Sequence, residues 1–357
     1  MKGWFVDGFW RTFCVEWVWK TFCVAWIWQG FCVNVLYKKF DSYKGWIYLS
    51  PAIILLLVFT AWPIFNTVRM AIWDGYNIFG ELNGTLNFKL GFSNFAQVIQ
   101  YHGFINCLKT TMILCILTVP LSTMLALVIA VCLNSIKPLR RFLQTIFFLP
   151  YVTNSIAIGM VFKAMFDIVG YKAYIDPVTG AISNTSDGII NEIIGIFGID
   201  PINWTNAGSS YAINIAVLVI YIVWNALPFK ILILLGGLQS VNKQYYEAAK
   251  IDATPPWRVF TRITVPLLSP MIAYVVITGF IGGFKEYTSI IGIFGESMQP
   301  PGAGAGTPRL QTMVGYIYDA LGTNSQGTAS AAAIILFLLI FAVTLVNLYV
   351  SKKKTHY

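Results

Sequence analysis

The sequence predicts an all-α membrane protein with six transmembrane helices. Of its 357 residues, 57% are hydrophobic and only 11% are charged, and the mean hydropathy is +0.68. Soluble globular domains usually contain about 25% charged residues. Six apolar stretches reach the roughly 20 residues that a helix needs to cross the hydrocarbon core of a bilayer. They run approximately over residues 46–68, 108–132, 142–166, 211–236, 268–291 and 328–350.

Lysine and arginine residues are divided unequally between the two sides of these helices. Thirteen lie on one side, namely Lys38, Lys39, Lys44, Lys137, Arg140, Arg141, Lys243, Lys250, Arg258, Arg262, Lys352, Lys353 and Lys354. Loops on the other side contain Lys89, Lys172 and Arg309, and the boundary residues Arg69, Lys109 and Lys163 raise that number to six at most. Cytoplasmic loops are enriched in positive charge, so both ends of the six-helix unit and residues 240–266 are predicted to be cytoplasmic.

The same pattern argues against a nucleic-acid partner. The net charge is +9, but the basic residues form short clusters beside apolar runs, as expected at membrane boundaries. The six cysteines lie in or beside apolar segments, without a CxxC pair or a histidine cluster nearby. They are Cys14, Cys23, Cys32, Cys107, Cys115 and Cys132. Neither a metal site nor a disulfide framework is indicated.

Residues 1–44 form an aromatic segment that precedes the six-helix domain, residues 45–351. Three imperfect nonapeptides, FWRTFCVEW, VWKTFCVAW and IWQGFCVNV, repeat within it. Nine residues are two and a half helical turns, so successive copies point to opposite faces of a helix. Tryptophan is enriched at membrane interfaces, so we expect an interfacial or accessory membrane helix rather than a functional cysteine array. Residues 21–37 are uncharged and leave a seventh span open.

The loops predicted outside the cell are long enough to meet a partner. They cover about residues 69–107, 167–210 and 292–327 and include the acids Asp176, Asp187, Glu192 and Asp200. The GAGAG stretch of residues 302–306 lacks a following Lys-Ser/Thr, and we interpret it as a flexible loop. The pattern GxxxxGK[ST] occurs nowhere in the chain, so any ATP hydrolysis has to come from another polypeptide. A basic cytoplasmic tail, residues 352–357, ends the chain.

Residues 240–266 form a polar insertion between two apolar stretches. Asn242 or Ser240 is predicted to cap a first helix, which carries the small residues Ala248 and Ala249 and ends at Asp252.

Thr254 and Pro255 are predicted to start a second helix as N-cap and first residue, and Pro266 is predicted to stop the helix after about Ile263. The pattern therefore indicates a helix, a turn and a helix that project from the membrane. The simpler alternative is a solvated amphipathic loop in which Glu247 pairs with Lys243 or Lys250.

This segment resembles the EAA loop of bacterial ABC importer permeases, which reads EAA, three residues, Gly, nine residues, Ile, one residue, Leu-Pro. The residues in register are Glu247, Ala248, Ala249, Ile263 and Pro266, whereas Ala253 and Val265 stand at the Gly and Leu positions. The resemblance covers residues 45–350 and is closest to the MalF-like, carbohydrate-importing permeases. Six stretches are typical of that branch: PAIILLLVFTAWP (51–63), FSNF (92–95), Val119-Pro120-Leu121 through Leu133-Asn134, FLP (148–150), LGGLQ (235–239) and GFK (283–285).

The resemblance implies coupling helices that seat in a cleft of a cytoplasmic ATPase. The coupling residues would be Glu247, Ala248, Ala249, Asp252, Ala253, Ile263 and Pro266, with Glu247 as the charge that pairs with the ATPase. It also implies a second permease subunit, two copies of a P-loop ATPase and an extracellular solute-binding protein as partners in a bacterial inner membrane. The chain itself would bind no cofactor, because ATP and Mg²⁺ belong to the partner ATPase.

A carbohydrate pathway needs polar and aromatic side chains near the bilayer midplane, because hydroxyls require hydrogen bonds and the C–H faces of sugars stack on rings. The candidates are Asn154, Ser155, Tyr221, Trp224, Asn225, Glu286 and Tyr287. For each of them the alternative is helix packing or an interfacial anchor. Lys285 beside Glu286 also leaves an ion pair open.

The sequence thus predicts a non-catalytic permease subunit of an ATP-driven oligosaccharide importer that works by alternating access. The same kind of importer for a glycerol phosphate ester is the nearest alternative. An ion channel and a polytopic membrane enzyme are alternatives of another class. A channel should contain a charged or carbonyl-rich filter motif, and an enzyme a convergent His, Asp or Ser set. His102 and His356 are the only histidines, and neither has a partner pattern.

Overall fold

The structure, a computed structural model, describes residues 44–46, 48–84, 89–136, 140–167, 174–175, 182–183, 188–206, 208–301 and 309–354. The nonapeptide repeat, the GAGAG stretch and His356 lie outside these residues, so the interpretations given for them stay predictions. Contacts between residues divide the chain into two units, Met1–Asn66 and Thr67–Tyr357.

From Tyr48 onward, the described part of the first unit belongs to an apolar helix that runs from Tyr48 to Ile72. It contains a π-helical turn, η2 (Leu57–Ala61), and continues as α4 (Trp62–Ile72). Between Tyr48 and Asn66 the described side chains are exposed or half-buried, although most of them are apolar. A helix that is apolar all round requires an apolar environment, and the described residues of its own unit do not bury it.

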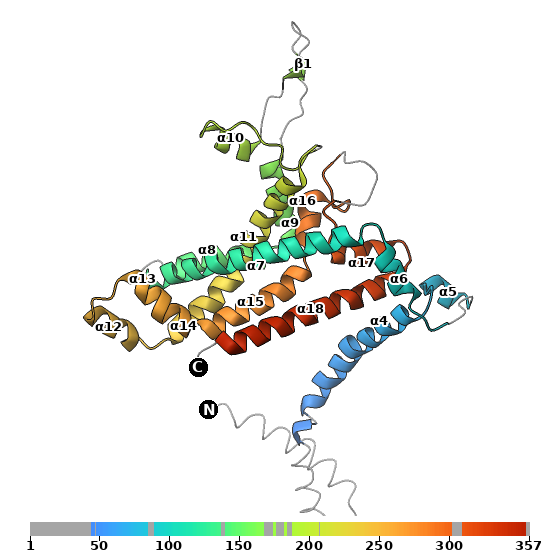
Figure 1. Ribbon diagram of the computed structural model, residues 1–357, viewed down its shortest axis with the longest axis horizontal. Coiled ribbons are helices and arrows are strands. Elements are labelled where there is room, and N and C mark those ends of the chain that lie inside the picture. Colours follow the sequence, from blue (N-terminus) through green and yellow to red (C-terminus); the bar gives the residue numbers. More distant parts are fainter. Residues whose placement is uncertain are drawn as a thin grey trace, which may run out of the picture. The chain divides into compact units, whose positions relative to one another are not determined.

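The second unit is a bundle of helices, shown with its labels in Figure 1. The short helices α5 (Ile78–Leu82) and α6 (Ser93–Gln100) lead into α7 (Phe104–Ser135), which packs along α11 (Tyr211–Ser240) and α15 (Ser269–Phe284). α18 (Gln326–Lys354) packs on α15 and on α17 (Met313–Gly322). Between α9 (Ser155–Phe166) and α11, the strands β1 (Tyr174–Ile175) and β2 (Ile182–Ser183) pair antiparallel, followed by α10 (Ile189–Gly195).

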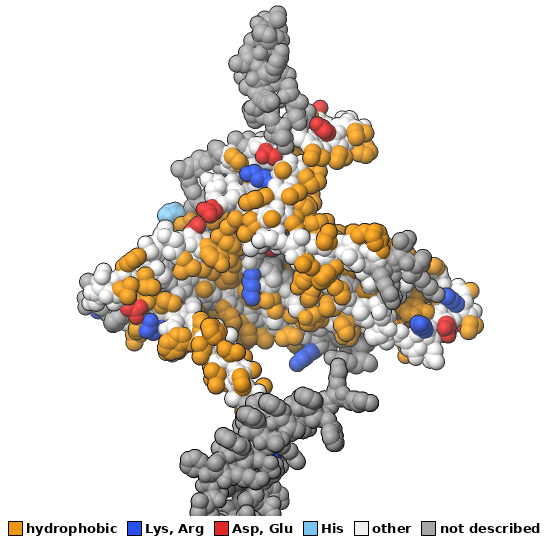
Figure 2. Space-filling view, turned by 180° about the vertical axis from the view of Figure 1, so that it is seen from behind, with side chains coloured by type: hydrophobic (Ala, Val, Ile, Leu, Met, Phe, Trp, Pro, Cys, Tyr) orange, Lys and Arg blue, Asp and Glu red, His pale blue; other side chains and the backbone are white. Residues whose placement is uncertain are grey.

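Four of the predicted spans correspond to unbroken helices that are long and apolar enough to cross a membrane. They are Tyr48–Ile72, Phe104–Ser135, Tyr211–Ser240 and Gln326–Lys353. Two bent helix pairs raise the number of spans to as many as six if each pair counts as one. The chain is therefore a multi-pass membrane protein, and Figure 2 shows apolar side chains over much of the visible face with few charges among them.

Two predicted spans are interrupted. The stretch 142–166 consists of α8 (Arg140–Val152) and α9 (Ser155–Phe166), whose described parts meet at 99°. The stretch 268–291 ends as a helix at Phe284 and resumes as α16 (Thr288–Phe294). The prediction of one continuous helix over each of these two ranges was wrong, because apolar composition does not reveal where a new helix begins.

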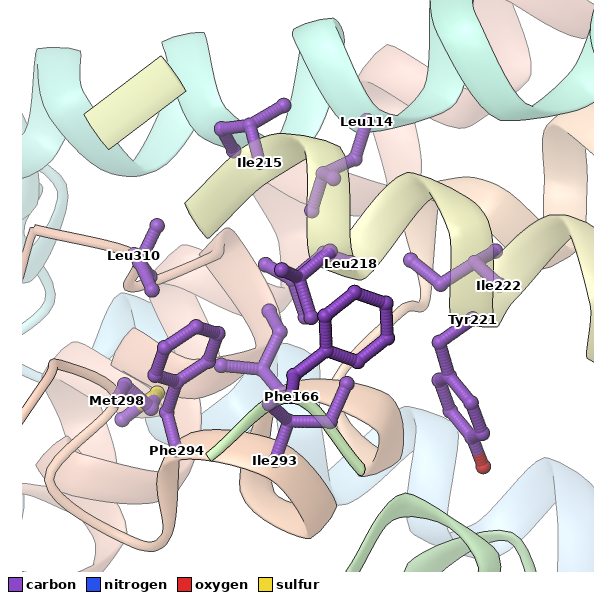
Figure 3. Close-up of a cluster of buried hydrophobic side chains, with 12 residues drawn as sticks. Leu114, Phe166, Ile215, Leu218, Tyr221, Ile222, Ile293, Phe294, Met298 and Leu310 are labelled. Atoms are coloured by element: carbon purple, nitrogen blue, oxygen red, sulfur yellow. The ribbon is translucent and has the colours of Figure 1, made fainter. Parts of the chain in front are cut away.

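The core between these helices includes a cluster of large apolar side chains from α7, α9, α11 and α16. Figure 3 shows Leu114, Phe166, Leu218, Tyr221 and Ile293 converging there. This cluster fixes α9, the second helix of the broken span, against α11, next to the candidate pathway residues.

Candidate functional site

The segment of residues 240–266 lies at the end of the bundle where α7 and α11 finish (Figure 1). α12 (Gln244–Ile251) begins after Lys243, and the Oδ1 of the preceding Asn242 accepts a hydrogen bond from Gln244 N at 3.0 Å. Ser240, the other predicted cap, instead ends α11 and donates to Gly237 O. The first of the two predicted helices is therefore confirmed, and it ends with Asp252 as its C-cap. The predicted N-caps, Asn242 and Ser240, were wrong, because Lys243 is the N-cap and no side chain caps the helix.

The turn after α12 is a Schellman motif with alanine in the left-handed position. Ala253 has a φ of +50°, its N–H donates to Lys250 O, and the N–H of Thr254 donates to Ala249 O. This conformation suits glycine, which has no Cβ to clash with the preceding carbonyl. The position at which the EAA pattern has glycine is thus a left-handed C′ residue, and Ala253 adopts that geometry at a steric cost.

The second helix starts one residue later than predicted and passes through Pro266. α13 (Pro256–Val259) has Pro255 as its N-cap, and the π turn η3 (Phe260–Thr264) joins it to α14 (Val265–Leu267). Pro266 was expected to stop the helix, and this was wrong. In the π turn Val265 N donates to Phe260 O, so the hydrogen-bonding pattern has already shifted before the proline, which lacks an N–H.

The two helices enclose a pocket against the ends of α7 and α11. Its volume is about 440 Å³, and its lining residues are Val131, Asn134, Ser135, Leu238, Tyr246, Ala249, Lys250, Thr254, Pro256, Val259, Phe260 and Thr264. The hydroxyl oxygens of Tyr246 and Thr264 lie 3.3 Å apart, which links α12 to η3 by a hydrogen bond. Ala249 is 5% exposed, so its small side chain is what allows α12 to approach closely.

Glu247 does not line this pocket and is exposed, as are Ala248 and Ile251. Within the part of the chain that the structure describes, Glu247 forms no ion pair with Lys243 or Lys250. The ion pair found there joins Arg69 and Glu81. A carboxylate on a rigid hairpin without an internal partner is available to a cation on another molecule.

The second candidate region is the break between α8 and α9. Asn154 is extended there, and its Oδ1 accepts hydrogen bonds from Ile156 N at 2.9 Å and Ala157 N at 3.4 Å. Asn154 therefore caps α9, and this capping role explains its conformation without any contact to a substrate. The carbonyl oxygen of its neighbour Ser155 accepts a hydrogen bond of 2.5 Å from the hydroxyl of Tyr221, on α11.

Tyr221 lies in the packed core and is 0% exposed, while its ring contacts Phe162 edge-on at 5.0 Å. Trp224, one turn later on α11, also packs on Phe162, with ring centroids 5.1 Å apart, and is 36% exposed. Asn225 is half-buried. Of these three candidates, Tyr221 is fully buried, whereas Trp224 and Asn225 retain accessible surface.

Glu286 and Tyr287 form the break between α15 and α16. The Glu286 carboxylate accepts a hydrogen bond from Ser289 N at 3.1 Å, and its carbonyl oxygen accepts one from Thr312 Oγ1 at 3.0 Å. Among the described residues it has no ion pair with Lys285. Tyr287 stacks on Tyr318 with centroids 4.4 Å apart and 14° between the ring planes. The two breaks lie near each other, because α16 packs on α9.

A polar cluster at the opposite end of the bundle from α12 was missed by the sequence analysis. Gln311 donates from its amide nitrogen to Asp319 and accepts at its amide oxygen from Cys107 Sγ at 3.2 Å. Burial raises the pKa of the Asp319 carboxyl, and the hydrogen bond from Gln311 opposes that rise. These contacts fasten α17 to the start of α7.

Lys230 was also missed. It is 5% exposed within α11, and its Nζ donates to three acceptors on α7, at distances of 2.6 to 3.3 Å. A lone lysine inside an apolar stretch was the available signal, since ionisable residues within spans are rare. Across the described residues no group of three His, Cys, Asp or Glu side chains could hold a metal ion.

Comparison with known proteins identifies relatives along most of the chain. A family model described as "Binding-protein-dependent transport system inner membrane component" matches residues 119–356. The lactose transport system permease protein LacF of Rhizobium radiobacter is 28% identical over 316 residues, which cover 87% of this chain and 93% of LacF. The trehalose/maltose permease protein MalF of Thermococcus litoralis is 27% identical over 310 residues, covering 86% and 93%.

A solved structure shares the fold. A chain of a bacterial ABC transporter involved in the import of the acidic polysaccharide alginate superimposes with a TM-score of 0.67 at 20% identity, covering 90% of this chain and 99% of the other. A second structure of the alginate transporter, in complex with a periplasmic protein bound to an alginate pentasaccharide, gives the same score. The fold described above is therefore shared with these structures over 90% of this chain.

Proposed function

The chain belongs to the family of binding-protein-dependent transport system inner membrane components, and we propose that it is the permease subunit of an ATP-driven carbohydrate importer. It is a non-catalytic membrane translocation subunit, as are the members of that family. The relatives named after lactose, arabinooligosaccharides and trehalose/maltose support a sugar or oligosaccharide as the substrate. A glycerol phosphate ester is the alternative that the experiment below separates.

The observation that carries the proposal is the geometry of the 240–266 segment. α12 and α13 form a hairpin, closed by a Schellman turn, that exposes Glu247 on its outer face. An exposed anion on a rigid element suits docking to a basic site of a separate protein. We assign that protein to a P-loop ATPase, present in two copies, which would bind ATP and Mg²⁺ in place of this chain.

The remaining partners are a second permease subunit and an extracellular solute-binding protein. The apolar helix from Tyr48 to Asn66, which has no buried side chain, is compatible with burial against lipid and a neighbouring subunit. The excess of basic residues supports a bacterial inner membrane location with the 240–266 segment and the carboxyl terminus in the cytoplasm.

For the substrate pathway we propose the region around the two helix breaks. Discontinuous helices line the substrate sites of many transporters, because their free backbone groups can bind polar ligands. Trp224 and Asn225 combine a ring with an amide on an accessible surface, which fits the C–H faces and hydroxyls of a sugar.

The solute-binding protein that co-purifies with the chain provides the test. Its thermal unfolding would be measured with lactose, arabinooligosaccharides, trehalose, maltose and glycerol phosphate esters, because a bound ligand stabilises the native state. Stabilisation by one of the sugars, followed by loss of uptake of that sugar when the chain is deleted, supports the proposal. Stabilisation by a glycerol phosphate ester alone would contradict the carbohydrate assignment.

A further inference from the structure

Lys230 joins α11 to α7 inside the bundle. Its Nζ donates to Ser122 Oγ at 2.6 Å, to Thr123 Oγ1 at 3.0 Å and to Val119 O at 3.3 Å. An ammonium group has three N–H donors, so one neighbouring helix supplies an acceptor for each.

No carboxylate neutralises this charge among the residues that the structure describes, where the ion pair found joins Arg69 and Glu81. The charge is therefore held by two hydroxyls and one carbonyl alone. A buried cation is stable only while such acceptors stay in place, because water is not there to replace them. Any displacement of α11 along α7 would break several of these hydrogen bonds together.

A third helix meets the same point. A Cβ atom on Gly279 of α15 would lie 3.1 Å from Val119 Cγ1 and 3.2 Å from Lys230 Nζ, so the absence of a side chain lets α15 approach. α11 ends just before the 240–266 segment, and α15 begins just after it. The two helices that flank this segment, α11 and α15, therefore both contact α7 beside the Lys230 side chain.

From this arrangement we infer that Lys230 is a positioning residue that makes α7 and α11 move as one body when the 240–266 segment is displaced during transport. The inference rests on the proposed function, since an importer requires motion at that segment to reach the membrane helices. Lys230 acts through α7 and does not contact the substrate, because its three donors are occupied by α7.

The test uses the full chain in complex with its partner ATPase. Met124 on α7 and Leu232 on α11 are 68% and 50% exposed and lie close in sequence to the bonded residues. Each would be replaced by p-acetylphenylalanine carrying a ketone-reactive spin label, which leaves the cysteines unchanged. The distance between the labels would be measured without nucleotide and after trapping with ATP, Mg²⁺ and vanadate.

We expect the parent complex to give one narrow distance distribution, unchanged between the two states. Lys230→Met keeps an unbranched side chain, one atom shorter, but removes the charge and the donors, and should broaden or shift the distribution in the trapped state. Thr118→Val is the matched control, because the Thr118 hydroxyl donates to Leu114 O within α7 and does not contact Lys230. It should behave as the parent does, although it too removes a buried hydroxyl.

Two results would overturn the inference: a shift between states in the parent, or an unchanged narrow distribution in Lys230→Met. If Lys230→Met does not assemble, the same distances are measured in the double variant Ser122→Ala/Thr123→Val, which removes two of the three acceptors and leaves the lysine. The distribution in the trapped state should again broaden or shift, and an unchanged narrow distribution would overturn the inference. Failure of the proposed function gives a different result, because a complex without an ATPase cannot be trapped by vanadate, whereas the nucleotide-free distance can still be measured.

Discussion

Gly159 of α9 and Gly292 of α16 are in backbone contact: a Cβ atom on Gly159 would lie 2.8 Å from Cα of Gly292, and one on Gly292 would lie 3.0 Å from Cα of Gly159. Each glycine follows one of the two helix breaks, so α9 and α16, the second helices of the two interrupted spans, meet where neither has a side chain. This contact keeps the breaks at Asn154 and Glu286 close to each other.

Gly159→Ala is expected to destabilise the protein by about 1–3 kcal/mol, because the new methyl group meets backbone that cannot move aside. Thermal unfolding of the purified protein in detergent measures this. Gly282→Ala on α15 is the control, since a Cβ atom there meets nothing within 4 Å. Equal unfolding temperatures for the two variants would show that α9 and α16 are not in backbone contact.

Tyr221→Phe should cost only about 0.5–1.5 kcal/mol, the net value of one hydrogen bond, because the ring that fills the core remains. Tyr221→Ala should cost about 3–5 kcal/mol, as expected when a buried aromatic side chain is removed. Denaturation of both variants checks the difference. A loss of substrate uptake by a stable Tyr221→Phe variant would instead assign the hydroxyl to the substrate pathway.

Ala253→Gly should stabilise the protein by about 1 kcal/mol, because glycine adopts the left-handed conformation without the clash that alanine has. Ala248→Gly, the same change within α12, should destabilise by about 0.5–1 kcal/mol. The opposite signs, read from the unfolding temperatures, separate the turn from general helix propensity. If both changes were destabilising, the turn at Ala253 would not be left-handed.

The Glu247→Lys variant should insert into the membrane normally, lose the partner ATPase and abolish uptake. A positive charge would then stand in place of the negative charge that the docking site on the ATPase recognises. Glu192→Lys, a charge reversal on α10, is the matched control and should retain the ATPase. Co-purification of the ATPase and uptake of the sugar bound by the binding protein are the measurements. Unchanged uptake by Glu247→Lys would remove the assigned role.

The long spans and the 240–266 hairpin were predictable because their signals are local. About 20 apolar residues predict a span, and the spacing from Glu247 to Pro266 places a turn at Ala253. The path of the chain through Pro266 was not predictable, since it follows a π turn in which Val265 N donates to Phe260 O, and the sequence does not mark that shift in hydrogen bonding. Likewise, Asn154 reads as an ordinary polar residue in a span until α9 is seen to start there.

The burial of Lys230 shows the same limit in another form. Its position within an apolar stretch was visible, but its acceptors Ser122 and Thr123 are more than 100 residues away in sequence. Only the packing of α11 on α7 brings them together. The same holds for Tyr221 and Ser155, two candidates for a substrate pathway that proved to be hydrogen-bonded to each other.

The most direct test of the importer assignment is mass spectrometry of the proteins that co-purify with the full chain, tagged at its carboxyl terminus and extracted gently from its own membranes. We predict a P-loop ATPase, a second permease with an EAA segment and a solute-binding protein. Recovery of this chain alone would contradict the assignment and favour a channel or another stand-alone membrane protein.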